Sequence, residues 1–220
     1  VRAALDEPLL RRFVMGLAMG TTSLLLVRSP LGQRSGAHFN PAVTITFWRL
    51  GRIAGPTALG YIVAQFVVGA SGMLLVSRLL GAGIAAPEVH WVVTRPGASL
   101  PVAFAAEAAM TFVLMSVVLR VSQSKRGNRW TAVCAGTLVC LYITFEAPLS
   151  GMSMNAARTF ASAIAAHDFT AFWLYARAPL LGMLLAAEAF VRSRGARAVH
   201  CAKLHHDSSS PCPFHCAPCA

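Results

Sequence analysis

The chain of 220 residues is 56% hydrophobic and only 12% charged. This composition is typical of an integral membrane protein and excludes an ordinary soluble domain. The net charge of +11 does not indicate nucleic-acid binding, because the basic residues gather at the ends of apolar segments, as topology signals do. No basic and aromatic platform for nucleic acid is present.

The order of apolar and polar segments predicts an all-α integral membrane protein. A polar N-terminal segment occupies residues 1–12. Five apolar runs are expected to span a bilayer, namely residues 13–27, 57–77, 101–119, 130–145 and 170–191. Two further apolar segments, 43–50 and one that ends near residue 166, are too short to cross and should be re-entrant.

Basic residues predict the orientation of these spans. The loop at 120–129 and the tail from residue 192 are the richest in arginine, so both are expected on the cytoplasmic side. The first short segment then enters the membrane from the inside and the second enters it from the outside.

A ten-residue motif occurs twice, at Ser35–Thr44 and at Ser150–Thr159, with an offset of 115 residues from Asn40 to Asn155. Each copy reads Ser-Gly, three residues, Asn, a pair of helix-compatible residues, one further residue and Thr. An asparagine before Pro41 and Ala42 is a helix start, because its side chain caps free backbone N–H groups. Two such starts in matching positions of two hydrophobic halves predict half-helices that meet inside the bilayer.

The same offset relates the spans to one another. It maps 130–145 and 170–191 onto the first two spans, whereas 101–119 maps to a position before residue 5. The second repeat, 101–191, therefore has three spanning helices and the first repeat, 13–80, has two.

These motifs resemble those of the aquaporin (major intrinsic protein) family over about residues 9–191. The resemblance rests on both ten-residue motifs and on Glu107 followed by Thr111 and Phe112. It implies an aquaporin-like inverted repeat within a transmembrane domain at 13–191, similar to a bacterial-type member that lacks the first of six spanning helices. The second motif departs from the usual Asn-Pro-Ala-Arg, since it reads Asn155-Ala156-Ala157-Arg158.

The two motifs are expected to form the centre of a pore, through Asn40, Pro41, Ala42, Asn155, Ala156 and Ala157. Each asparagine amide can donate to the oxygen of a passing neutral molecule. The two helix N-termini add roughly half a positive charge each, which repels protons and cations. Alanine at position 156 should have a modest effect, because it is a good helix former and leaves the cap in place.

The resemblance also implies a selectivity filter. Arg158 would donate to the permeant molecule and oppose cations, and the other filter positions transfer to Met19, Ile143 and Met152. Such a filter would be more apolar than that of a strict water channel, which favours additional permeants such as glycerol. The alternative is that the methionines and the isoleucine are core side chains.

Two further residues are expected to support the re-entrant loops. By resemblance, Glu107 accepts hydrogen bonds from the backbone of such a loop. His38, beside the first motif, is expected to fix its loop and not to act as a ligand. The acceptor that matches Glu107 in the first repeat would sit in the missing helix, so the first loop should lack it.

The tail at 192–220 is rich in cysteine and histidine. Seven residues could bind zinc or another soft metal, namely Cys201, His205, His206, Cys212, His215, Cys216 and Cys219. A cytoplasmic position argues against disulfides. The alternative is a flexible tail without a ligand.

The function that these features predict is a passive channel for water and small uncharged solutes, and not an enzyme. The expected partners are the lipid bilayer and three further copies in a homotetramer, in the plasma (inner) membrane, with no nucleic acid. The alternative is a truncated, non-conducting membrane protein whose tail binds metal or a partner. An ion channel is disfavoured by two helix N-termini and an arginine aimed at the lumen.

Overall fold

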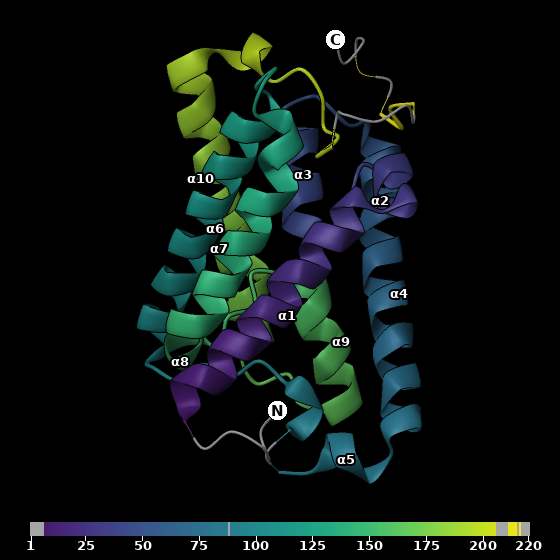
Figure 1. Cartoon of the computed structure of the whole chain (residues 1–220), viewed down its shortest axis with the longest axis vertical. Coiled ribbons are helices and arrows are strands. Elements are labelled where there is room, and N and C mark those ends of the chain that lie inside the picture. The colour runs from purple at the N-terminus through teal and green to yellow at the C-terminus, as the bar shows by residue number, and fades with distance from the viewer. Residues whose placement is uncertain (1–6, 88, 206–210, 215, 217–220) are drawn as a thin grey trace.

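The computed structural model of the chain describes residues 7–87, 89–205, 211–214 and 216. Throughout these residues the regular structure is helical, and a bundle of long helices surrounds two short ones (Figure 1). The elements in chain order are α1 (Pro8–Arg28), α2 (Pro30–Ser35), α3 (Pro41–Arg49), α4 (Gly55–Leu80), α5 (Ala82–Ala85), the 3₁₀ turn η1 (His90–Val92), α6 (Leu100–Ser122), η2 (Asn128–Trp130), α7 (Thr131–Phe145), α8 (Ala147–Ser150), α9 (Ala156–Ala166), α10 (Phe172–Arg194) and η3 (Ala196–Ala198).

Four helices, α1, α4, α6 and α10, are long and apolar enough to cross a membrane. They confirm the all-α membrane fold. The fifth expected span, α7, has 15 residues and rises roughly 22 Å at 1.5 Å per residue, less than the ~30 Å of a bilayer core. The short elements η2 and α8 adjoin its two ends.

The first span begins earlier than expected. The sequence pattern assigned residues 1–12 to a polar segment, but α1 already starts at Pro8. The Glu7 side chain accepts a hydrogen bond from the N–H of Leu10 and proline fits the first turn, so the local capping signal extends the helix through Arg11 and Arg12. The segment that connects α4 to α6 contains two short elements, α5 and η1.

The bundle is built from closely packed helix pairs, α1 with α7 and α6 with α10. The first pair approaches through glycines. A Cβ atom built on Gly16 would lie 2.6 Å from the Cys140 carbonyl oxygen, and one on Gly20 would lie 2.5 Å from that of Gly136. Small residues thus let two membrane helices approach closely, and the Gly-xxx-Gly pair serves ordinary helix packing.

The two short apolar segments form half-helices. The structure places α3 in the upper half of the bundle and α9 in the lower half (Figure 1). With 9 and 11 residues, they rise roughly 14 and 16 Å, so neither can cross a bilayer. Both contact α4 and α10.

The start of the tail folds back onto the bundle. Val199, Cys201 and Ala202 have no exposed surface, and Lys203 is 2% exposed. Val199 and Ala202 join the main hydrophobic core, and Phe214 packs against it. This first part of the tail therefore packs against the bundle through apolar side chains. The expected alternative of a flexible tail is wrong for this segment.

Candidate functional site

The two motif asparagines cap the two half-helices. Asn40 Oδ1 accepts from the N–H of Ala42 at 2.9 Å. Asn155 Oδ1 accepts from the N–H of Ala157 at 3.0 Å and from that of Arg158 at 3.3 Å. The cap at the start of α9 therefore forms although Ala156 replaces proline, because capping depends on the asparagine side chain.

The same asparagines also link the two motifs to each other. Asn40 Nδ2 donates to the carbonyl oxygen of Met154 at 2.7 Å, and Asn155 Nδ2 donates to that of Phe39 at 2.7 Å. Each amide thus bonds the residue that precedes the other asparagine. An amide NH₂ group carries two hydrogens, so each asparagine keeps a second donor. Motif spacing did not predict this reciprocal pair.

Glu107 of α6 accepts hydrogen bonds from the second loop. It has no exposed surface. Its Oε1 accepts from the Ser153 N–H at 2.6 Å and the Ser150 hydroxyl at 3.0 Å, and its Oε2 accepts from the Met154 N–H at 2.7 Å. Such charge-assisted bonds compensate for burying a carboxylate.

The backbone of this loop is unusual. Met152 and Met154 both have a positive φ, 48° and 56°, a left-handed conformation that costs about 1–2 kcal/mol for residues with a Cβ atom. The two N–H groups that bond Glu107 belong to Ser153, which lies between these methionines, and to Met154 itself. The carboxylate therefore stabilises a loop shape that the local sequence does not favour.

Different side chains hold the first loop. His38 is 4% exposed, and its ring bonds the Thr44 hydroxyl through Nδ1 at 3.3 Å and the Ala202 carbonyl through Nε2 at 2.7 Å. A carbonyl only accepts, so Nε2 carries the hydrogen. Two α4 side chains complete the support, since Gln65 donates to the His38 carbonyl at 2.7 Å and Tyr61 to that of Ser35 at 2.8 Å.

Sequence reasoning expected His38 to fix this loop but missed Gln65 and Tyr61. The signal was a glutamine and a tyrosine within an otherwise apolar span, four residues apart and thus on one helix face. They bond the first loop through its carbonyl oxygens, whereas Glu107 bonds the second loop through its N–H groups.

The structure brings together only part of the predicted filter. Ile143 and Met152 meet in one apolar cluster with Met110 and Met154. Met19 lies on α1 with 43% of its surface exposed and is not among the described members of that cluster.

Arg158 bonds the loop between η1 and α6. In α9 it follows the cap by three residues, and its Nη1 bonds the hydroxyl of Thr94, which is 6% exposed. Thr94 lies between η1 and α6. The loop that connects the two repeats thus orients the arginine.

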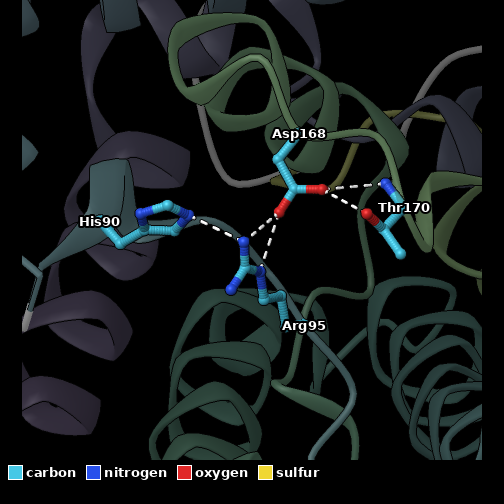
Figure 2. A network of polar contacts seen from close by, with 4 residues as sticks. All are labelled: His90, Arg95, Asp168 and Thr170. Atoms are coloured by element: carbon cyan, nitrogen blue, oxygen red, sulfur yellow. Dashed lines mark hydrogen bonds and ion pairs between the residues drawn. The ribbon is translucent and has the colours of Figure 1, made fainter.

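The same loop is tied to the end of α9 by an ion pair that sequence reasoning missed. Arg95 Nη2 lies 2.6 Å from Asp168 Oδ2, and Asp168 Oδ1 accepts from the Thr170 hydroxyl and N–H (Figure 2). The Thr170 bonds, with Arg95, lower the pKa of Asp168 to about 2. His90 Nε2 lies 3.0 Å from the same Nη2 atom of Arg95 (Figure 2).

The tail brings three of its predicted metal ligands together. The Sγ atoms of Cys201, Cys212 and Cys216 lie within 4.8 Å of one another, and hydrogen bonding to Cys201 is the largest cause that lowers the pKa of Cys216 to about 6. His205 is not part of this group. The remaining predicted ligands, His206, His215 and Cys219, lie outside the described residues.

Comparisons with known proteins agree with this arrangement. The family model described as "Major intrinsic protein" matches residues 9–190. Aquaporin NIP1-3 of Oryza sativa subsp. japonica is 34% identical over 175 residues, which cover 79% of this chain and 59% of that protein. The probable aquaporin AqpM of Archaeoglobus fulgidus is 34% identical over 182 residues, covering 80% of this chain and 74% of that protein.

The fold is also found among solved structures. The X-ray structure of the aquaglyceroporin from Plasmodium falciparum superposes with a TM-score of 0.60 at 18% identity, covering 83% of this chain and 95% of that chain. The chain spans 53% to 59% of the length of the plant relatives NIP1-3, NIP6-1 and the NIP-type protein of Nicotiana alata. The match over almost all of the helical bundle, with the two capped half-helices at its centre, shows that this chain belongs to the major intrinsic protein family.

Proposed function

We propose that the chain forms a passive transmembrane channel for water and small uncharged solutes such as glycerol, and that it is not an enzyme. The observation that carries the proposal is the pair of half-helices whose N-termini are joined by Asn40 and Asn155. Half-helix N-termini that meet inside a bilayer form a site for small polar molecules.

The chemistry of this site suits a neutral permeant. Each asparagine amide has one hydrogen committed to the opposite loop, and the second can bond the oxygen of a passing molecule. Two helix N-termini, with roughly half a positive charge each, repel protons and cations at the same point. Neutral hydrogen-bond acceptors are therefore favoured over ions.

The proposed filter combines Arg158 with the apolar pair Ile143 and Met152. We include Met19 as the fourth position, on the basis of motif spacing. With one charged donor and apolar walls, the filter offers few polar partners and accommodates the carbon chain of a small alcohol as well as water.

Orientation and assembly belong to the same proposal. The channel occupies residues 13–191, with repeats at 13–80 and 101–191, in the plasma (inner) membrane. The arginine-rich loop at 120–129 and the tail from 192 face the cytoplasm. Four copies assemble as a homotetramer, and each subunit contains a pore.

Osmotic shrinkage of vesicles that contain the purified chain tests this function. We expect water permeability above that of empty vesicles, with no cation current. The variants Asn155→Trp and Arg158→Trp should abolish it. The matched control is Arg177→Trp, because Arg177 is an exposed arginine of α10 whose position in the sequence lies outside both motifs. Permeability equal to that of empty vesicles would favour the alternative, a non-conducting membrane protein.

A further inference from the structure

Three thiols of the tail form a compact cluster next to the first re-entrant loop. Cys201 is completely buried, and Cys212 and Cys216 are partly buried. The Cys201 and Cys212 sulfurs are 3.4 Å apart, and all three sulfurs lie within 4.8 Å of one another. None of the three forms a disulfide.

This spacing matches thiolate ligation of one metal ion. A Zn–S bond of ~2.3 Å in tetrahedral geometry places sulfur ligands about 3.8 Å apart. The cluster therefore needs only small side-chain movements to close on an ion. Thiolates select soft ions such as Zn²⁺ over Mg²⁺ or Ca²⁺, and each thiol releases a proton to solvent when it binds.

The tail segment around the cluster is fixed against the loop that leads to Asn40. The N–H of Leu204 donates to the Gly36 carbonyl at 3.1 Å, and the Ala202 carbonyl accepts from His38 at 2.7 Å. Phe214 lies between Cys212 and Cys216 in the sequence. Its ring centroid is 5.1 Å from that of His38 and 5.6 Å from that of Tyr61.

The bundle also holds the tail through Gln123, which follows α6. Its Nε2 donates to the Cys201 carbonyl at 2.9 Å, and its Oε1 accepts from the N–H of His200 at 2.7 Å. The first thiol is thus anchored to the helical bundle, whereas Cys212 and Cys216 flank the aromatic contact with the loop. An ion shared by all three would tie Phe214 to this anchored position.

We propose that Cys201, Cys212 and Cys216 bind one Zn²⁺ ion, and that the ion fixes the tail, with Phe214, over the loop at Gly36–His38. The ion links the segment that is anchored on Gln123 to the segment that packs on His38 and Tyr61. Because that loop continues directly into Asn40, the tail that the ion holds covers the cytoplasmic entrance of the pore that leads to the paired asparagines. Only this last consequence depends on the proposed channel function.

Metal analysis of the full-length protein tests the site independently of transport. The purified chain in detergent, with a reductant, is titrated with Zn²⁺ alone, and bound metal and hydrogen exchange at the Leu204 amide are measured. We expect one ion per chain and slower exchange with Zn²⁺. The triple variant C201S/C212S/C216S should lose both effects, whereas C134S/C140S, which changes the two α7 cysteines, should keep both.

Three results would overturn the site: no bound Zn²⁺ in the native chain, equal binding by the triple serine variant, or a Cys201–Cys212 disulfide in protein isolated from cells. The covering role is tested by vesicle permeability. Phe214→Ala should conduct equally with Zn²⁺ and with chelator, whereas the native chain should conduct less with Zn²⁺. If the permeability of the native chain does not change with Zn²⁺, the covering role is wrong. If neither the native chain nor any variant conducts, the covering role and the channel function are both wrong.

Discussion

Buried polar side chains decide the shape of both re-entrant loops. Glu107 is an acidic residue in an apolar span, yet three donors of the second loop surround its carboxylate. The first loop depends on His38 and Gln65. The role of Glu107 was predictable from the pattern Glu-x-x-x-Thr-Phe and the family resemblance. The role of Gln65 was not, since its acceptor is a backbone carbonyl that only the folded loop presents.

We predict that Glu107→Gln lowers the thermal stability of the protein in detergent. A glutamine amide has one acceptor oxygen where the carboxylate has two, so at least one of the Ser153 and Met154 N–H groups loses its partner. An unsatisfied buried donor costs about 1–3 kcal/mol. Thermal unfolding measures the change.

The matched control for this prediction is Glu188→Gln in α10. Glu188 pairs with Arg49 at 2.8 Å, but the two side chains are 42% and 60% exposed, and exposed pairs contribute about 0–1 kcal/mol. If both variants unfold at the same temperature, Glu107 does not hold the loop in the way its hydrogen bonds indicate.

At the scale of elements, the close α1–α7 pair depends on the absence of side chains. We predict that Gly20→Ala destabilises the bundle, because the added methyl would meet the Gly136 carbonyl at 2.5 Å. Overpacking of this kind costs about 1–3 kcal/mol. Gly72→Ala in α4 is the control, since no atom lies within 4 Å of the added group, and alanine is the better helix former. Equal unfolding temperatures for the two variants would contradict the packing.

The Arg95–Asp168 pair joins two elements far apart in the chain, and we predict that its contribution depends on pH. The folded pKa of Asp168, about 2, lies below the ordinary 3.8. The Thr170 bonds, which are the largest causes of this shift, and Arg95 together favour the ionised carboxylate. Ionised Asp168 therefore stabilises the protein above about pH 4, and this stability is lost as pH falls toward 2. The difference in unfolding temperature between the native chain and Asp168→Asn should shrink over that range.

The double variant with Arg95→Gln isolates the coupling of the pair. It should unfold at the same temperature as Asp168→Asn alone, because the interaction is already lost. A native-to-variant difference that stays constant down to pH 2 would show that ionisation of Asp168 does not stabilise the protein.

At the scale of the whole molecule, we predict that the two ends of the bundle face different compartments. In a background without cysteine, Lys125→Cys and His167→Cys place single thiols at exposed positions on the loop after α6 and at the end of α9. A membrane-impermeant maleimide should label position 167 only from outside the cell and position 125 only from the cytoplasm. If each position were labelled only from the other side, the true orientation would be the inverse of the proposed one. If both positions were labelled from the same side, the proposed topology would be wrong.

The sequence by itself determined four of the five expected spans, the two half-helices and their caps, because these depend on local hydropathy and on signals within a few residues of each helix end. The sequence pattern predicted the C-terminal end of α9 (Ala156–Ala166) correctly. It placed the start of α1 too late, because the Glu7 cap was overlooked. The family resemblance added Glu107 and Arg158, whose partners lie in other loops.

Only the tertiary structure decided which distant groups meet. The Asn155 amide bonds a carbonyl 116 residues away, Asp168 pairs with Arg95 across 73 residues, and His38 bonds the tail across 164 residues. Such contacts form when helices pack and loops return to one another, and no local pattern records them. The assembly of the cysteine cluster on the first loop is of the same kind, because seven candidate ligands in the sequence gave no indication of which three thiols the fold would bring together.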